Sequence, residues 1–191
     1  MIDTYEKELI KKASKGDDAA FEALAEKYRN LIYRICLIQL KSRENALDVS
    51  QNVLIKIWKN ISLFRFESSF STWVYSITRN AVNDFIRREK RRSEFSADEI
   101  GNEGDAKTPV SERETPHEAV LKKERSEILR NAIYSLSNEH QDVIILRDIE
   151  GYSYSEIASI LSENEGTVKS RINRARKALK ETLKKRNFFG D

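Results

Sequence analysis

The chain has 191 residues, of which 39% are hydrophobic and 34% charged, and a formal net charge of only +3. This length allows one domain or two small domains, each with a modest core. A single cysteine, Cys36, excludes a disulfide within the chain and fits a reducing cytoplasm; we expect it to be a buried small hydrophobic residue. The two histidines, His117 and His140, give no metal-ligand cluster, and no apolar run reaches the ~20 residues that span a bilayer. We therefore expect no metal or other cofactor and no direct membrane insertion.

The N-terminal part, residues 1–92, has the apolar spacing of helices and no alternation typical of strands. Asp17 or Asp18 can cap the first predicted helix, whose buried stripe consists of Phe21, Leu24, Tyr28, Leu31, Ile32 and Ile35. A second predicted helix is marked by Val49, Val53, Ile57 and Ile61. A third predicted helix, over about 71–92, has four apolar residues on one side, namely Val74, Ile77, Ala81 and Phe85. This range is therefore predicted to form one helical domain.

An acidic segment without sustained apolar periodicity follows. Residues 93–118 contain eight Asp or Glu against one Lys and one Arg, a net charge of −6. Both prolines of the chain, Pro109 and Pro116, lie in this segment. Such a composition is typical of a mobile tether. We interpret residues 93–116 as a flexible acidic linker between two domains.

The C-terminal part, residues 117–187, is again periodic in helical fashion. Helices are expected at 117–136, 138–149, 153–161 and 165–186. The predicted fold class is all-α, with two helical domains joined by the linker.

A capped short helix, a turn and a long basic helix follow one another in the second domain. Ser153 and Glu156 have the spacing of a capping box, and Asn164 can cap the next helix after a turn of about four residues. This order is that of a helix-turn-helix motif, whose second helix enters the major groove of DNA.

The long basic helix has two different faces. At 100° per residue, one side gathers Val168, Ile172, Ala175 and Leu179. The opposite side and its flanks carry Thr167, Lys169, Ser170, Arg171, Asn173, Arg174 and Lys177. From 168 to 186 there are nine Lys or Arg and one Glu. Cations neutralise phosphates and short polar or arginine side chains reach base edges, so these residues are our candidates for duplex reading. A solvated basic helix without a DNA role is the alternative.

The first domain contains an aromatic, serine-rich loop at 64–73 (FRFESSFSTW), followed by a helix with a polar stripe and a basic end. Rings stack on unpaired bases and amides bind base edges, so the pattern suits melted DNA. The candidate strand-binding residues are Phe66, Ser68, Ser69, Ser71, Ser76, Arg79, Asn80, Asn83, Arg87 and Lys90. For Phe64, Phe66, Phe70 and Trp73 the alternative is that the rings belong to the core.

Both motifs, in this order, resemble the extracytoplasmic-function (ECF) sigma factors of bacterial RNA polymerase. The resemblance is carried by 151–158 (GYSYSEIA) and 166–176 (GTVKSRINRAR), and in the first domain by 16–28, 48–58 and 70–92. It covers about 15–92 and 117–182. The C-terminal motif alone also occurs in other helix-turn-helix regulators.

The resemblance implies a division of labour. The domain at 1–92 would dock on the β′ clamp helices of core polymerase and capture the melted −10 strand, and the domain at 117–187 would read the −35 duplex and meet the β flap. The linker would thread toward the active-centre cleft and the RNA exit channel. The candidate polymerase contacts are Asp48, Gln51, Asn52, Ile55 and Lys59. Leu47 and Asn52 stand where carboxylates are common in the family, so a smaller electrostatic share is expected in this contact.

We therefore expect a cytoplasmic, non-enzymatic initiation subunit whose partners are core polymerase and promoter DNA, with an anti-sigma factor as a further candidate. One alternative is a stand-alone helix-turn-helix regulator, although no extra dimerisation segment is evident. The other is a nuclease or nucleotide-modifying enzyme, but no GxxxxGK[ST] run, metal set or convergent carboxylates were found.

Overall fold

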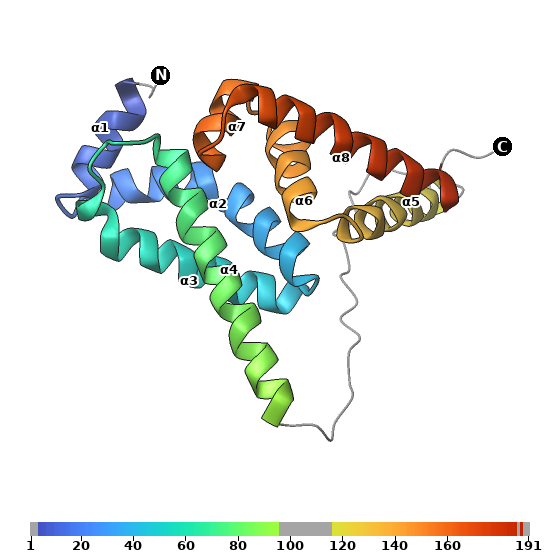
Figure 1. Ribbon diagram of the computed structural model, residues 1–191. Helices are drawn as coiled ribbons and strands as arrows, with labels where there is room; N and C mark the ends of the chain where they lie inside the picture. Colours follow the sequence, from blue (N-terminus) through green and yellow to red (C-terminus); the bar gives the residue numbers. More distant parts are fainter. Residues whose placement is uncertain (1–3, 96–115, 187, 189–191) are drawn as a thin grey trace.

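A computed structural model describes residues 4–95, 116–186 and 188 of the chain. Within these residues it contains helices and no strand, which confirms the all-α prediction. The N-terminal helices are α1 (Thr4–Ala13), α2 (Asp18–Leu40), α3 (Arg43–Asn60), the 3₁₀ turn η1 (Ile61–Leu63) and α4 (Phe70–Phe95). The C-terminal helices are α5 (Pro116–Tyr134), α6 (Asn138–Ile144), the π-helical turn η2 (Ile145–Ile149), α7 (Tyr154–Leu161) and α8 (Glu165–Lys185). Figure 1 shows the two groups of helices.

Helix α2 is the centre of the N-terminal domain and packs against α1, α3 and α4. Its first turn is capped as expected, because the Asp17 carboxylate accepts a hydrogen bond of 2.9 Å from the amide of Ala20. The apolar stripe predicted for this helix is buried from Leu24 to Ile35, and only Phe21 is partly exposed. Cys36 is fully buried, and burial raises the pKa of its thiol to about 12.

Helix α1 was not predicted as a separate element. Its apolar face is short, and one of its three buried residues is an acid, Glu6. The Glu6 carboxylate accepts hydrogen bonds from the Tyr28 hydroxyl at 2.6 Å and from the Lys27 ammonium at 2.9 Å. Burial, and then the bond to Glu6, raise the pKa of Tyr28. These polar contacts hold α1 on α2. The spacing of apolar residues could not predict them, because they are made by polar side chains of two different helices.

The C-terminal helices agree with the predicted ones within about two residues, apart from the π-helical turn that ends the second of them. The chain reverses at Gly151, where φ is +78°, a value that favours glycine. Arg147 stabilises this reversal by donating a 2.8 Å hydrogen bond to the carbonyl of Tyr152. The core of the domain lies between α6, α7 and α8, and includes Val143, Leu146, Ile157 and Ile172.

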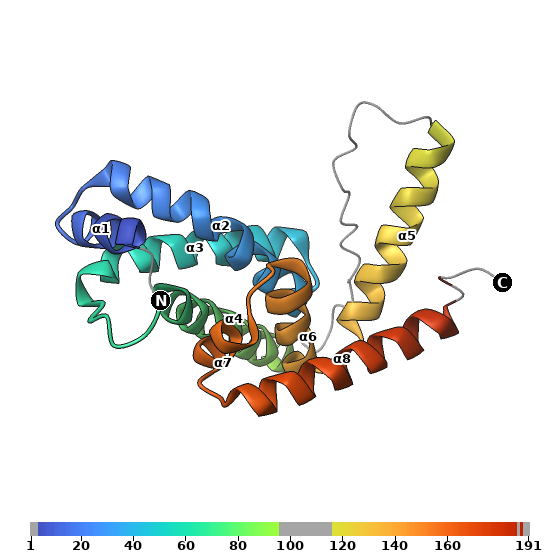
Figure 2. The ribbon, with the colours of Figure 1, turned by 90° about the horizontal axis from the view of Figure 1, so that it is seen from above.

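The two domains are in contact. Helix α7 packs on α4, and α5 and α6 pack on α2 (Figure 2). The buried hydrophobic residues of both domains form one connected cluster. The acidic linker predicted for 93–116 lies outside the described residues, except that α4 continues to Phe95 and α5 begins at Pro116.

Candidate nucleic-acid and polymerase interfaces

The second helix of the helix-turn-helix is fixed by two local caps. Ser153 and Glu156 form the predicted capping box at the start of α7, and hydrogen bonds from Ser153 lower the pKa of the Glu156 carboxyl. Asn164 caps α8, since its side-chain oxygen accepts from the amide of Thr167 at 3.0 Å and from its hydroxyl at 2.8 Å. Between the helices Ser162 has the left-handed conformation, with φ +55°. The turn therefore forms with a serine in a conformation that favours glycine.

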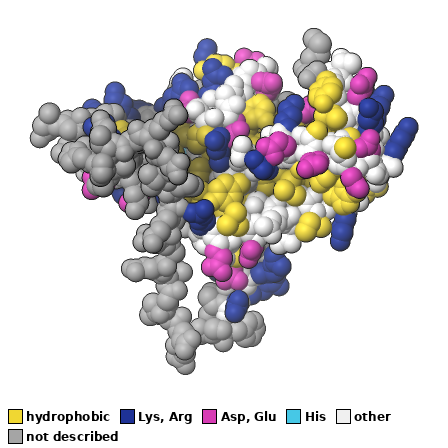
Figure 3. Space-filling model, turned by 180° about the vertical axis from the view of Figure 1, so that it is seen from behind, with side chains coloured by type: hydrophobic (Ala, Val, Ile, Leu, Met, Phe, Trp, Pro, Cys, Tyr) yellow, Lys and Arg dark blue, Asp and Glu magenta, His cyan; other side chains and the backbone are white. Residues whose placement is uncertain are grey.

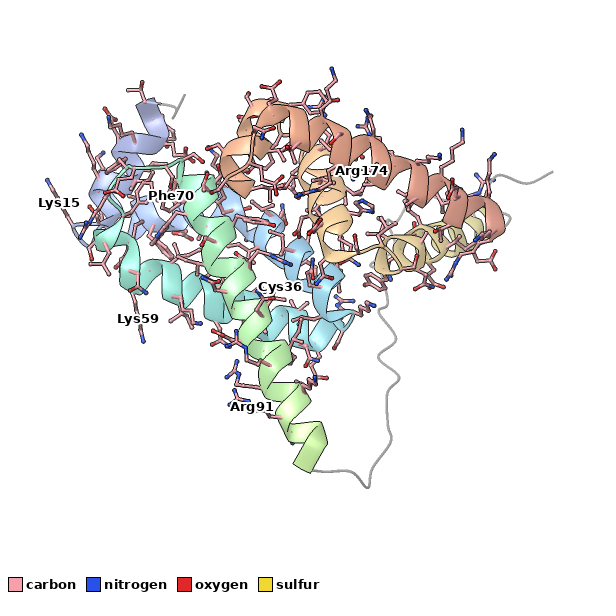
Figure 4. The ribbon with its side chains drawn as sticks, viewed as in Figure 1. Lys15, Cys36, Lys59, Phe70, Arg91 and Arg174 are labelled. Carbon is pink, nitrogen blue, oxygen red and sulfur yellow. The ribbon has the colours of Figure 1, made fainter. Side chains whose placement is uncertain are left out.

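Helix α8 buries the predicted apolar side and exposes the predicted polar side. Val168, Ile172 and Ala175 are fully buried, and Leu179, the fourth residue predicted on this side, is partly buried. Five of the seven candidates for duplex reading are exposed on the outside, namely Lys169, Ser170, Asn173, Arg174 and Lys177. Arg174 lies along the outer surface of this helix (Figure 4). An uncovered face of this composition can approach phosphates and base edges.

Arg171, a sixth candidate, is held by the protein itself. Its guanidinium lies 2.8 Å from Glu163 in the turn and 3.8 Å from Glu139 of α6, and its side chain is only 16% exposed. The seventh, Thr167, is partly buried at the cap. Arg171 thus links α8 to the turn and to α6 through ion pairs. Its place in the helical projection of the sequence did not predict this role. Its contact with DNA stays a prediction.

The four rings around the loop at 64–73 form one cluster. Phe64 and Phe70 are buried, so the alternative that they are core residues is confirmed. Trp73 lies 5.4 Å, between ring centroids, from both Phe64 and Phe70, and Phe66 lies 4.9 Å from Phe64. Phe66 and Trp73 are partly exposed, and Phe66 has φ +61°. Two buried rings thus support two rings that are only partly buried, and the Lys7 ammonium lies over the Phe66 ring, 5.8 Å from its centroid.

Ser69 has a structural task that the sequence did not indicate. Its hydroxyl accepts a hydrogen bond of 3.1 Å from the amide of Thr72 and also pairs with the hydroxyls of Ser71 at 2.8 Å and Thr72 at 2.6 Å. This geometry closes the first turn of α4 in the manner of an N-cap. Ser68 stays exposed at the tip of the loop.

The polar stripe of α4 is exposed along most of its length, at Ser76, Asn80, Asn83, Arg87 and Lys90. Arg91, in its basic end, projects from the lower part of the helix (Figure 4). Arg79 differs, because it faces the C-terminal domain and its guanidinium lies 3.6 Å from the Asp142 carboxylate of α6. Helical periodicity does not predict this ion pair, because it joins residues that are far apart in the sequence.

The five candidate polymerase contacts lie on the outer face of α3 and are all exposed. Lys59 points away from the domain (Figure 4). The opposite face buries Val49, Val53 and Ile57. Leu47 and Ile55 are 43% and 50% exposed, so the outer face carries apolar surface beside its charges. This fits the smaller electrostatic share expected from the sequence.

Seen from behind, the surface mixes hydrophobic side chains with Lys, Arg, Asp and Glu (Figure 3). Among the described residues no group of His, Cys, Asp or Glu could hold a metal ion. In the same part of the chain, every helix is too short or too polar to cross a membrane.

Two family models match these domains. The model for sigma-70 region 2 matches residues 24–92, and the model for sigma-70 region 4 matches residues 126–179. Helix α1 precedes the first match. The fold and the two matches define a sigma-70-type protein built of regions 2 and 4.

Relatives extend over nearly the whole chain. The ECF RNA polymerase sigma factor SigW of Bacillus subtilis is 35% identical over 180 residues, which cover 93% of this chain and 96% of SigW. The ECF RNA polymerase sigma-E factor of Haemophilus influenzae is 33% identical over 92% of this chain and 93% of its own length. The chain therefore belongs to the ECF family of RNA polymerase sigma factors, which act in promoter-specific initiation of transcription.

Two solved structures have a similar fold. The sigma factor RpoE of Bartonella quintana, crystallised with the anti-sigma factor NepR, has a TM-score of 0.67 and 26% identity, over 86% of this chain and 96% of RpoE. CnrH, in complex with the cytosolic domain of CnrY, has a TM-score of 0.65 and 22% identity, over 94% of this chain and 97% of CnrH, and shows the fold alone.

Proposed function

We propose that this chain is a non-catalytic specificity subunit that reads the −35 element as duplex with α8 and captures the melted −10 strand with α4 and the loop before it. The observation that carries the proposal is the face of α8, where five polar or basic side chains lie exposed opposite a fully buried stripe. A recognition helix needs this combination, because the buried side fixes its orientation while the outer side contacts DNA.

Strand capture is supported by the aromatic loop and the polar stripe that continues from it. Each base that stacks on a ring contributes ~1–3 kcal/mol. Phe66 and Trp73 are the rings with accessible surface, and Asn80 and Asn83 offer amides to base edges. Arg87 and the basic end of α4 would hold the backbone through contacts that weaken with salt.

The proposed partners follow from this division of roles. Core polymerase would bind the outer face of α3 through its β′ clamp helices and α5–α8 through its β flap, and it would carry out the phosphoryl transfer in the cytoplasm. An anti-sigma factor is a further proposed partner, since the RpoE relative was crystallised with one. The threading of the acidic linker stays a proposal about residues outside those described.

The test is transcription with purified core polymerase on genomic fragments of the source bacterium, with alignment of the start sites. Arg174→Ala should weaken −35-dependent initiation. The free-energy difference between promoters with a matching and an altered −35 element should fall by ~1–3 kcal/mol, while core binding is unchanged. Lys184→Ala, an exposed cation near the end of the same helix, is the matched control and should change promoter choice little. An equal loss of core binding in Arg174→Ala would contradict the assignment of roles.

A gel shift without polymerase separates this proposal from the stand-alone regulator. Tight, sequence-specific binding to paired half-sites by the chain alone would favour the regulator. Weak binding alone, with specific complexes only after core polymerase is added, is the result expected here.

A further inference from the structure

Helix α1 lies beside the loop that carries the aromatic cluster. It packs on η1, the turn directly before this loop, and its Lys7 ammonium lies over the Phe66 ring, 5.8 Å from the ring centroid. The match to sigma-70 region 2 covers 24–92 and so begins after α1. Lys7 was not among the residues that the sequence suggested for DNA binding. A cation from outside the matched region therefore reaches one of the two rings proposed to stack on the captured strand.

The position of Lys7 is fixed by its neighbour Glu6. Glu6 is buried, and its carboxylate accepts hydrogen bonds from the Tyr28 hydroxyl and the Lys27 ammonium. Successive side chains of a helix are turned by about 100°, so Lys7 projects from the flank of the face that Glu6 buries. Because the Glu6 carboxylate is already paired with Lys27, its charge is not left over for Lys7. Lys7 is thus held beside the loop and keeps its charge available.

The charges around the Phe66 ring favour an anion. Arg65 and Glu67, the exposed neighbours of Phe66 in the loop, carry opposite charges that cancel. Lys7, which is exposed, therefore supplies the net positive charge beside the ring.

The ring cluster lies between α1 and the start of α4 (Figure 1). Phe66 contacts Phe64 at 4.9 Å and Phe64 contacts Trp73 at 5.4 Å, between ring centroids. Trp73 lies in the first turn of α4, and the exposed polar stripe of that helix begins at Ser76. A strand that follows this stripe and crosses the rings would arrive at Lys7.

A phosphate is a better partner for Lys7 than the ring is. The contact between an exposed ammonium and a phenyl ring is weak, and 5.8 Å is close to the limit of its range. A nucleotide that stacks on Phe66 brings its own phosphates beside the ring, and the flexible lysine side chain can turn from the ring to one of them. We propose that Lys7 binds a backbone phosphate of the captured strand at Phe66, so that α1 forms part of the strand-binding surface. This inference rests on the proposed function and extends its −10 site.

The test uses the chain bound to core polymerase and a promoter fragment from the start-site mapping, in which mismatches keep the −10 region unpaired. Lys7→Ala should weaken binding of this fragment ~5-fold at low salt and make the slope of log K against log salt concentration shallower by ~0.7. Lys7→Arg should keep both values, because it keeps the charge. Lys12→Ala is the matched control, since it removes the same charge from an exposed position on the opposite flank of α1, and it should change neither value.

The other outcomes separate this inference from the proposed function. Unchanged binding and slope in Lys7→Ala would overturn the inference alone. Tighter binding would overturn it as well, because Lys7 would then only cover the ring against bases. An equal loss of affinity for core polymerase without DNA would make Lys7 a polymerase contact instead. If the unchanged chain itself gives no promoter-specific complex, the proposed function fails and the inference falls with it.

Crosslinking tests the position of Lys7 directly. A thiol-reactive photo-crosslinker is attached to Lys7→Cys or, as the control, to Lys12→Cys. Cys36 should stay unmodified, since it is buried and burial raises its pKa to about 12. On irradiation of the promoter complex, Lys7→Cys should crosslink to the unpaired −10 strand and Lys12→Cys should not. No crosslink to DNA from Lys7→Cys, or an equal yield from the two positions, would overturn the inference.

Discussion

Replacing Arg171 by alanine separates a structural role from DNA reading. The guanidinium lies 2.8 Å from Glu163, and the two side chains are 16% and 27% exposed. The second oxygen of Glu163 is buried without a hydrogen-bond partner, so removal of Arg171 leaves a largely buried carboxylate with no compensating charge. A hydrogen bond to a charged group contributes about 1.5–3 kcal/mol. Partial exposure reduces this, and we expect a loss of about 1–2 kcal/mol in the free energy of unfolding.

The assay is urea unfolding of the full chain, followed by circular dichroism, for Arg171→Ala, Glu163→Ala and the double variant. The two single changes should couple by about 1 kcal/mol, because each removes the same ion pair. Arg174→Ala serves as control, since its guanidinium only returns to Ser170 of its own helix, at 3.4 Å. Unchanged stability in Arg171→Ala, together with a loss confined to −35 promoters, would refute the structural reading and restore Arg171 as a base or phosphate contact.

Three further outcomes are expected. Glu6→Ala should destabilise the N-terminal domain by about 1–3 kcal/mol, because it leaves the buried Tyr28 hydroxyl without its acceptor. Unfolding in urea, followed by tryptophan fluorescence, measures this loss, and the exposed Glu8→Ala is the control. An equal effect of the two changes would contradict the prediction. Ser69→Ala should cost about 1 kcal/mol through loss of the bond to the Thr72 amide, and a melting temperature no lower than that of Ser68→Ala would disprove the cap. Cys36 should resist a thiol reagent at pH 8 until the chain unfolds, because burial raises its pKa to about 12. The folded chain favours the protonated thiol, so this contribution to stability is present below the ordinary pKa of about 9 and is lost as the pH rises toward 12. Rapid labelling of the native chain would contradict this prediction.

The sequence by itself determined the elements whose causes are local. The capping box at Ser153 and Glu156 and the cap at Asn164 each join residues three apart, and both form as predicted. The sequence assigned the first cap to Asp17 or Asp18, and Asp17 makes it. The two faces of α8 followed from helical periodicity, because a helix projects side chains at fixed angles whatever lies around it. The order of the motifs was sufficient to identify the family.

The tertiary structure decided what depends on residues far apart in the chain. Arg79 and Asp142 are 63 positions apart, and Glu6 and Tyr28 lie on different helices, so no local pattern shows that these groups meet. Arg79, Arg171 and Ser69 resembled solvent-exposed DNA contacts in sequence, yet each makes a contact within the protein. Periodicity tells which side of a helix is polar. It does not tell whether water, DNA or another domain covers that side, because this depends on the packing of the whole chain.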